Sequence, residues 1–246
     1  MTQLNVRLQP RDIEITSFLR AQGYATFEQL QSMFFRSKAS CSKRLVALQA
    51  SGYIVSQNAT DIFKGKKEFT PMILGLNVHP LTKIYSLSQI FRKQIPETNR
   101  LLKQHLVMHQ LLLNHVRFQL KGYVEDYNLL LNDPQMKTWS LIDVGRRKEF
   151  TPDLSFEFDN HSMAIELERT LKSLNRYMER FAYFQTSSYT HVHYIYVNEG
   201  HLPTLLKYSG SSRIFGFSHY LNPTEVFSNT WGYMRLNDWV SKLKTI

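Results

Sequence analysis

Residues 151–169 read TPDLSFEFDNHSMAIELER, two runs of alternating apolar and polar side chains on either side of Asp159-Asn160. Alternation with a period of two is typical of β-strands, and this dipeptide suits a two-residue hairpin turn. Such a turn sets a register in which Asp153 lies directly opposite Glu166, with Cβ atoms about 5 Å apart. The stretch therefore predicts an antiparallel hairpin that brings two carboxylates together.

The same alternation divides the predicted hairpin into two faces. We expect the apolar face to be the core, and it holds Leu154, Phe156, Phe158, Ile165 and Leu167. The other face is acidic, and it holds Asp153, Ser155, Glu157, Glu166 and Glu168. Because like charges opposite each other destabilise a sheet, this face needs water or a cation. Hard divalent ions such as Mg²⁺ prefer carboxylate oxygens.

Basic residues follow the hairpin at helical spacing. Lys172, Arg176 and Arg180 recur every four residues, so we expect them on one face of a helix over residues 171–184. A metal held by two acids, with a lysine beside it, is suited to phosphodiester hydrolysis, because the metal activates water and the lysine stabilises phosphate charge. The alternative is a surface hairpin whose acids pair with a basic helix.

The composition indicates a folded chain without disulfides or membrane spans. It has 246 residues, is 43% hydrophobic, and contains one cysteine, Cys41, which excludes a disulfide scaffold and a zinc site with several cysteine ligands. No apolar run approaches the roughly 18 residues of a membrane helix, and residues 1–10 lack a signal-peptide core. We therefore expect a cytoplasmic protein without membrane insertion.

The formal charge of +10 lies in the first half of the chain. Residues 1–120 contain 16 Lys and Arg against 6 Asp and Glu, whereas residues 121–246 contain 14 of each. A polyanion partner is therefore expected for the first half.

That half has the pattern of a winged helix-turn-helix. Helices are predicted from Pro10 to Gly23, over 27–33 with Thr26 as N-cap, and over 38–50, followed by strands over 53–57 and 68–74. The expected core residues are Ile13, Phe18, Leu19, Leu30, Met33, Leu45, Val46 and Leu48. The third helix and the wing bring together the candidate DNA contacts, which are Arg36, Lys38, Lys43, Arg44, Lys64, Lys66 and Lys67. The alternative is a solubilising surface.

The remainder of the chain predicts an α/β (α+β) domain with a mixed sheet. A connecting helix is expected within 96–122, then strands over 139–143, 151–158 and 163–168, and a buried strand over 191–197 after the basic helix. The predicted organisation is a DNA-binding domain at 1–95, the connecting helix at 96–122 and a second domain at 123–246.

The sequence from Thr151-Pro152-Asp153 to Ile165-Glu166-Leu167-Glu168 resembles the PD-(D/E)xK nuclease core. With the basic, tyrosine-containing helix after it, the chain more narrowly resembles the plasmid replication-relaxation family, which includes MobC-type relaxases. The resemblance implies a winged helix joined to a restriction-endonuclease-like domain, with Asp153 and Glu166 binding Mg²⁺ or Mn²⁺. It also implies site- and strand-specific nicking of plasmid DNA at the origin of transfer, together with accessory mobilisation and coupling proteins, in the bacterial cytoplasm.

One position departs from the motif, because its lysine falls at Glu168. Either Lys172 replaces that lysine from the following helix, or the site has lost activity. A further alternative is that Glu168 is a third metal ligand or positions a water. On the family's helix, Arg176 is a further candidate DNA contact. A degenerate site would leave a non-catalytic replication initiator or regulator, and a symmetric dimer would suit a restriction-type double-strand nuclease.

Other residues with chemical potential are interpreted as structural. His191-Val192-His193 fits the metal motif of a different nickase class, but no third ligand is evident, so ordinary strand residues are favoured. His105 and His109 have the i, i+4 spacing of a helical metal pair without an acid at a useful spacing, and a packed helix is favoured. Cys41 is expected to be a small packed residue. The thirteen tyrosines, Tyr24 among them, give no firm nucleophile.

Overall fold

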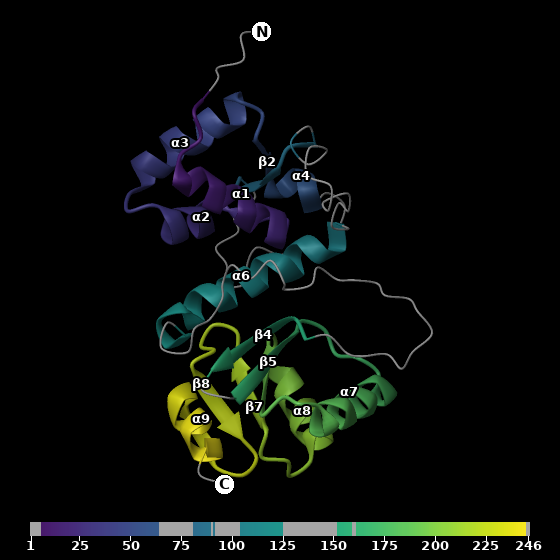
Figure 1. The fold of residues 1–246 in the computed structure, drawn as a ribbon. Coiled ribbons are helices and arrows are strands. Elements are labelled where there is room, and N and C mark those ends of the chain that lie inside the picture. Colours follow the sequence, from purple (N-terminus) through teal and green to yellow (C-terminus); the bar gives the residue numbers. More distant parts are fainter. Residues whose placement is uncertain are drawn as a thin grey trace. The chain divides into compact units, whose positions relative to one another are not determined.

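The computed structural model describes residues 6–63, 81–89, 91, 104–124, 152–158 and 161–244 (Figure 1). The chain divides into two compact units, Met1–Phe118 and Gln119–Ile246. The predicted strand over 139–143 and the wing lysines Lys64, Lys66 and Lys67 lie outside the described residues. In the described part, no helix is long and apolar enough to cross a membrane.

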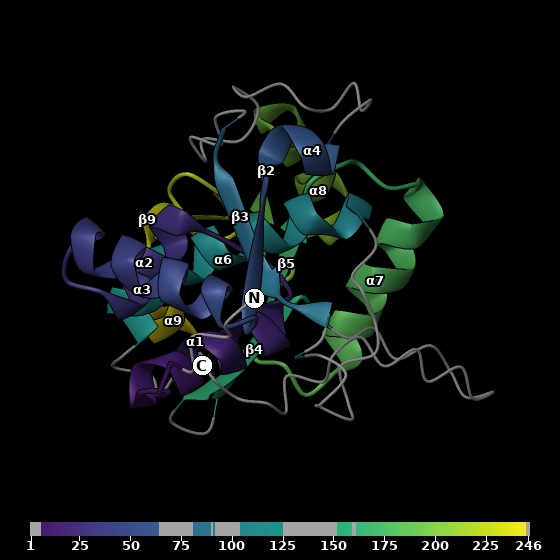
Figure 2. The ribbon, with the colours of Figure 1, turned by 90° about the horizontal axis from the view of Figure 1, so that it is seen from above.

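The first unit combines helices with a small antiparallel sheet. Its elements are α1 (Pro10–Gln22), β1 (Ala25–Thr26), α2 (Phe27–Phe34), α3 (Lys38–Ala50), β2 (Ile54–Asn58), α4 (Ala59–Phe63), β3 (Lys83–Leu87) and most of α6 (Gln104–Val124). The strand order is β1-β3-β2. Figure 2 shows α1, α2 and α3 beside the paired strands β2 and β3.

Local signals place the helices of this unit where the sequence predicts them. Gly23 follows α1 with a φ of 79°, a conformation that favours glycine. Thr26 caps α2 by accepting a hydrogen bond from the backbone N–H of Gln29, whose side chain accepts one from the Thr26 backbone in return. Ser37 caps α3 by accepting from the Ser40 N–H.

The core of the first unit confirms most of the expected residues. Its fully or nearly fully buried members include Ile15, Phe18, Leu19, Leu30, Cys41, Leu45, Leu48, Ile54, Tyr85 and Leu87. Two predictions were wrong, because Ile13 is 57% and Val46 60% exposed. Each lies on the outer face of its helix, since the neighbouring apolar residues already cover the core-facing side.

The antiparallel partner of β2 is β3, in which Leu87 lies opposite Ile54 and Lys83 opposite Asn58. The strand predicted over 68–74 lies outside the described residues. In the described part of the chain, α4 follows β2 directly and the next strand is β3, which begins at Lys83.

Side-chain amides join α6 to the helices before it. Gln29 Nε2 donates to the Leu111 carbonyl at 2.9 Å, and Asn114 Nδ2 donates to the Tyr24 carbonyl at 2.9 Å. Gln110 also donates to the side-chain oxygen of Gln22 at 2.7 Å. The described part of the predicted connecting helix, from Gln104 to the boundary at Phe118, therefore packs as part of the first unit.

The second unit is built on a mixed six-stranded sheet in the order β4-β5-β6-β7-β8-β9. Its strands are β4 (Leu154–Phe158), β5 (His161–Glu168), β6 (His191–Tyr196), β7 (Phe215–His219), β8 (Glu225–Ser228) and β9 (Gly232–Arg235). Its helical elements are α7 (Leu174–Thr186), η2 (Glu199–His201), α8 (Leu202–Ser209) and α9 (Leu236–Lys244). Strands β5, β6 and β7 are parallel, and the other neighbours are antiparallel. The predicted α/β class with a mixed sheet is confirmed.

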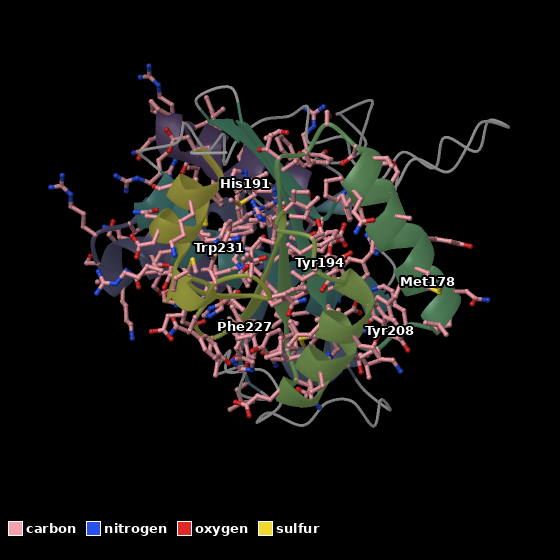
Figure 3. All side chains as sticks on the ribbon, turned by 90° about the horizontal axis from the view of Figure 1, so that it is seen from below. Met178, His191, Tyr194, Tyr208, Phe227 and Trp231 are labelled. Carbon is pink, nitrogen blue, oxygen red and sulfur yellow. The ribbon has the colours of Figure 1, made fainter. Side chains whose placement is uncertain are left out.

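Helices cover both faces of this sheet. In Figure 3, α7 and α8 lie on the side of Tyr194 and α9 lies on the side of His191. The α7–α8 side is aromatic, with Tyr177, Phe181, Phe184, Tyr194, Phe215 and Phe217 buried together. On the α9 side, Trp239 contacts the rings of His191 and His193. Both faces are therefore inaccessible to water along the central strands.

Candidate functional site

The hairpin forms in the predicted register. Leu154 lies opposite Ile165 and Phe158 opposite His161, so Asp153, one residue before β4, faces the position of Glu166. Asp153 is half-buried, and its Oδ2 accepts a hydrogen bond from the Leu167 backbone N–H at 2.8 Å. The two carboxylates meet where β4 begins and β5 ends.

Glu166 is almost completely buried beneath α7, with 2% of its surface exposed. Its Oε2 forms an ion pair with the Arg180 guanidinium at 2.5 Å. Its Oε1 is buried and has no hydrogen-bond partner among the described residues. Burial raises the pKa of Glu166, with Arg180 acting against the rise and the charge of Asp153 adding to it.

Glu168 is also buried, and it pairs with Lys172, whose Nζ donates to Oε2 at 2.5 Å. Lys172 precedes α7, and its backbone N–H donates to the Tyr177 hydroxyl at 3.2 Å. The lysine is therefore held next to the acid that occupies the motif's lysine position.

The two glutamates at the end of β5 are buried, and each pairs with a cation: Glu166 with Arg180 of α7, and Glu168 with Lys172. The expectation that three cations share one helix face was wrong, because Lys172 lies before α7, Arg176 is exposed and Arg180 is buried. The i, i+4 spacing of Arg176 and Arg180 does not determine how the helix is rotated about its own axis against the sheet, and therefore which of the two is buried.

The acids could hold a divalent cation. Within the described residues there is no group of three or more His, Cys, Asp or Glu side chains suited to a metal. The pair of Asp153 and Glu166 nevertheless fits a hard ion that retains several waters, because Oε1 of Glu166 is a buried carboxylate oxygen to which none of the described residues donates a hydrogen bond. Glu168 is instead engaged by Lys172.

The basic residues of the first unit separate into two kinds. Arg36, just before α3, and Lys38 and Lys43 on α3 are exposed, as a DNA-contacting surface requires. Arg44 is different, because its guanidinium donates to both carboxylate oxygens of the fully buried Asp12. Its prediction as a DNA contact conflicts with this ion pair, which holds its side chain against α1.

The histidine pair of β6 is structural in this fold. Both rings are fully buried, with His191 Nδ1 2.8 Å from the Thr190 hydroxyl and His193 Nε2 2.8 Å from the Ser218 hydroxyl. Burial lowers the pKa of His193 to about 3. Cys41 is likewise fully buried, as expected, and burial raises the pKa of its thiol to about 11.

A comparison with protein families matches residues 17–196 to the replication-relaxation model. The chain belongs to the replication-relaxation family. Searches of curated proteins and of solved structures found no significant match. Membership in this family indicates a role in plasmid replication or relaxation.

The replication-relaxation match extends from α1 to the end of β6 and so includes both acids and α7. Within it, sequence reasoning missed the role of Arg180, which was expected only as part of a basic helix face. The pattern that could have identified it is the amphipathic character of α7, in which Tyr177, Phe181 and Phe184 are buried and Arg180 lies among them. An arginine within an apolar stripe calls for a buried acid opposite it.

Proposed function

We propose that this protein is a metal-dependent endonuclease that nicks one strand of plasmid DNA at an origin of transfer. The observation on which the proposal rests is that Asp153 and Glu166 meet across the β4–β5 hairpin, where Oε1 of Glu166 has no hydrogen-bond partner in the described part of the chain. Family membership supports plasmid DNA as the substrate.

In this proposal each residue has a distinct task. Asp153 and Glu166 hold Mg²⁺ or Mn²⁺, and Arg180 fixes the carboxylate of Glu166 through its Oε2. Such an ion supplies an activated water and neutralises phosphate charge when it is bound. Lys172 stabilises charge on the scissile phosphate, and Glu168 keeps the lysine in place until the phosphate arrives.

In this proposal the first unit binds duplex DNA and the second unit cleaves it. The first acts as a winged helix, with exposed Arg36, Lys38 and Lys43 contacting duplex phosphates, and the second is a nuclease domain of the PD-(D/E)xK kind. In this proposal the winged-helix domain comprises residues 1–95, the connecting helix 96–122 and the nuclease domain 123–246. Accessory mobilisation and coupling proteins are the proposed partners, in the bacterial cytoplasm.

The test uses purified full-length protein, a supercoiled plasmid with the origin, and Mn²⁺, with products resolved on a denaturing gel. We expect nicking by the wild type and none by Asp153→Asn. The amide retains an oxygen that can accept from the Leu167 N–H, so the hairpin is preserved. Glu179→Gln is the matched control, because it removes an exposed acid from α7.

Wild-type nicking by Asp153→Asn would refute the assigned site. Loss of nicking together with loss of duplex binding would point to misfolding, so binding is measured on the same preparations. Glu166→Gln is a weaker probe, because it leaves Arg180 opposite a neutral partner in a buried setting.

A second candidate is a non-catalytic plasmid replication initiator or regulator. Two ion pairs favour it, since Glu166 and Glu168 already have Arg180 and Lys172 as partners. Thermal unfolding with and without Mn²⁺ separates the candidates. An ion at 100 times its dissociation constant stabilises by about 2.7 kcal/mol, and Asp153→Asn should abolish that gain. Unchanged unfolding of the wild type, with duplex binding intact, supports the regulator.

A further inference from the structure

Directly opposed side chains form a row across the sheet of the second unit, starting at the candidate metal ligand. Glu166 on β5 lies opposite Tyr194 on β6, and Tyr194 lies opposite Phe217 on β7. Phe217 in turn faces Phe227 on β8, which faces Tyr233 on β9. Because cross-strand partners share a face, all five side chains lie on the α7–α8 side.

The character of the row changes along its length. Tyr194 and Phe217 are fully buried and their rings stack at 6.0 Å. Phe227 is half-buried, and Tyr233 is 70% exposed. Helices thus cover the row near the acids and leave its far end open.

Phe227 and Tyr233 form a preformed aromatic platform. Their ring centroids lie 4.8 Å apart with an interplanar angle of 66°, so Phe227 supports Tyr233 edge to face. A supported ring loses little conformational freedom when a ligand stacks on it, which lowers the cost of binding. The platform lies on the last two strands of the sheet's order, where β9 has a neighbour only in β8 among the described residues.

The charges around the platform favour stacking over attraction to a duplex backbone. Arg235 is exposed on the same face as Tyr233, two residues further along β9, and Glu225 lies opposite it. The half of the chain from residue 121 has no net charge. An exposed aromatic ring with one arginine beside it is suited to stacking against an unpaired base. Single-stranded DNA exposes the faces of its bases, whereas in duplex DNA they are stacked on one another.

We propose that the platform of Phe227 and Tyr233 binds a base of single-stranded DNA on the same face of the sheet as the candidate cleavage site, with Arg235 contacting the base or a phosphate. Four strand spacings separate Glu166 from Tyr233, which corresponds to about 19 Å. A strand cut at the acids therefore reaches the platform within a few nucleotides. This inference deepens the proposed nicking function and rests on it.

The first test measures binding of a fluorescently labelled single-stranded oligonucleotide to the full-length protein in EDTA. We expect Tyr233→Ala to weaken binding about tenfold, whereas Tyr233→Phe keeps the ring and the wild-type affinity. Leu221→Ala is the control, because it truncates another exposed apolar side chain, 50% exposed, in the same unit. Binding of a duplex of the same sequence should not change in any variant.

Two outcomes of this binding test would overturn the proposal. One is wild-type single-strand affinity in Tyr233→Ala; the other is an equal loss for the single strand and the duplex. In a second measurement, an oligonucleotide carrying 5-iodouracil is irradiated, and the cross-link should map to the peptide that contains Tyr233. Cross-linking elsewhere in the chain also contradicts the platform, as does self-association that Tyr233→Ala abolishes without affecting DNA binding.

The outcome is independent of the nicking assay. Because the binding assay contains no metal, Asp153→Asn should bind the single strand like the wild type. If nicking fails while binding depends on Tyr233, the nuclease proposal is wrong and the platform remains. If nicking succeeds while Tyr233 is irrelevant, only the platform is wrong.

Discussion

Replacing Arg44 by methionine should destabilise the first unit without removing a DNA contact. The arginine lies on α3 next to the exposed Lys43, yet its guanidinium is directed to Asp12 on α1. Methionine keeps most of the apolar stem and removes only the charged fork. The variant therefore isolates the ion pair from side-chain packing.

The expected cost follows from what Asp12 loses. The carboxylate is fully buried, and after the substitution it retains the Gln9 backbone N–H at 2.6 Å but neither Arg44 donor. Removing one partner of a buried pair costs about 3–5 kcal/mol, and the 18% exposure of Arg44 places the value near 3 kcal/mol. For a unit of this size the melting temperature should fall by roughly 10 °C.

The pH dependence gives a second signature. Burial works to raise the pKa of Asp12, but the hydrogen bonds from Arg44 and the Gln9 backbone outweigh it and lower the pKa below 3.8. A lowered pKa stabilises the folded state above the unfolded value, and the gain disappears as pH falls through the folded value. The Arg44→Met variant should lose this acid sensitivity.

The assay combines thermal unfolding with duplex-DNA anisotropy at a temperature where both proteins are folded. Lys43→Ala serves as the opposite control, because Lys43 is exposed on the same helix. It should leave the melting temperature unchanged and reduce the salt dependence of binding by about one charge. If Arg44→Met keeps the wild-type melting temperature and loses DNA affinity, the structural assignment of Arg44 is refuted.

Three further predictions concern packing and titration. Gly216→Ala should destabilise the second unit by about 1–3 kcal/mol, since an added Cβ would lie 2.9 Å from the Trp239 ring; wild-type stability in chemical denaturation would contradict this. Because burial lowers the pKa of His193 from 6.5 to about 3, stability of that unit should decline as pH falls below 6.5, and His193→Gln should flatten the decline in pH-dependent unfolding. Leu45→Ala should cost about 2–5 kcal/mol, whereas Val46→Ala should stay within about 0.5 kcal/mol, and equal melting temperatures would show the burial assignment to be wrong.

Local patterns in the sequence predicted the elements because they act over a few residues. Gly23 and Thr26 fix helix ends through backbone conformation and capping hydrogen bonds. The Asp159-Asn160 dipeptide, with period-two alternation, predicted the hairpin register that brings Asp153 to Glu166. Alternation also places His191 and His193 on one face of their strand, where both rings contact Trp239.

Whether a charged side chain is exposed or pairs with a buried partner depends on elements distant in sequence. Lys43 and Arg44 are adjacent on α3, yet only Arg44 meets a buried carboxylate, because α1 lies on its side of the helix. The partner of β2 could not be read locally, since its antiparallel neighbour β3 begins only at Lys83, far along the chain.

The sequence by itself determined which residues share a strand face or a helix turn, and hence that two acids would meet across a hairpin. Only the tertiary structure decided that α7 lies over those acids, pairs Glu166 with Arg180, and leaves Tyr233 uncovered at the far end of the same row. The physical reason is that periodicity fixes the direction of a side chain relative to its own backbone. What covers that side chain is set by the packing of elements remote along the chain.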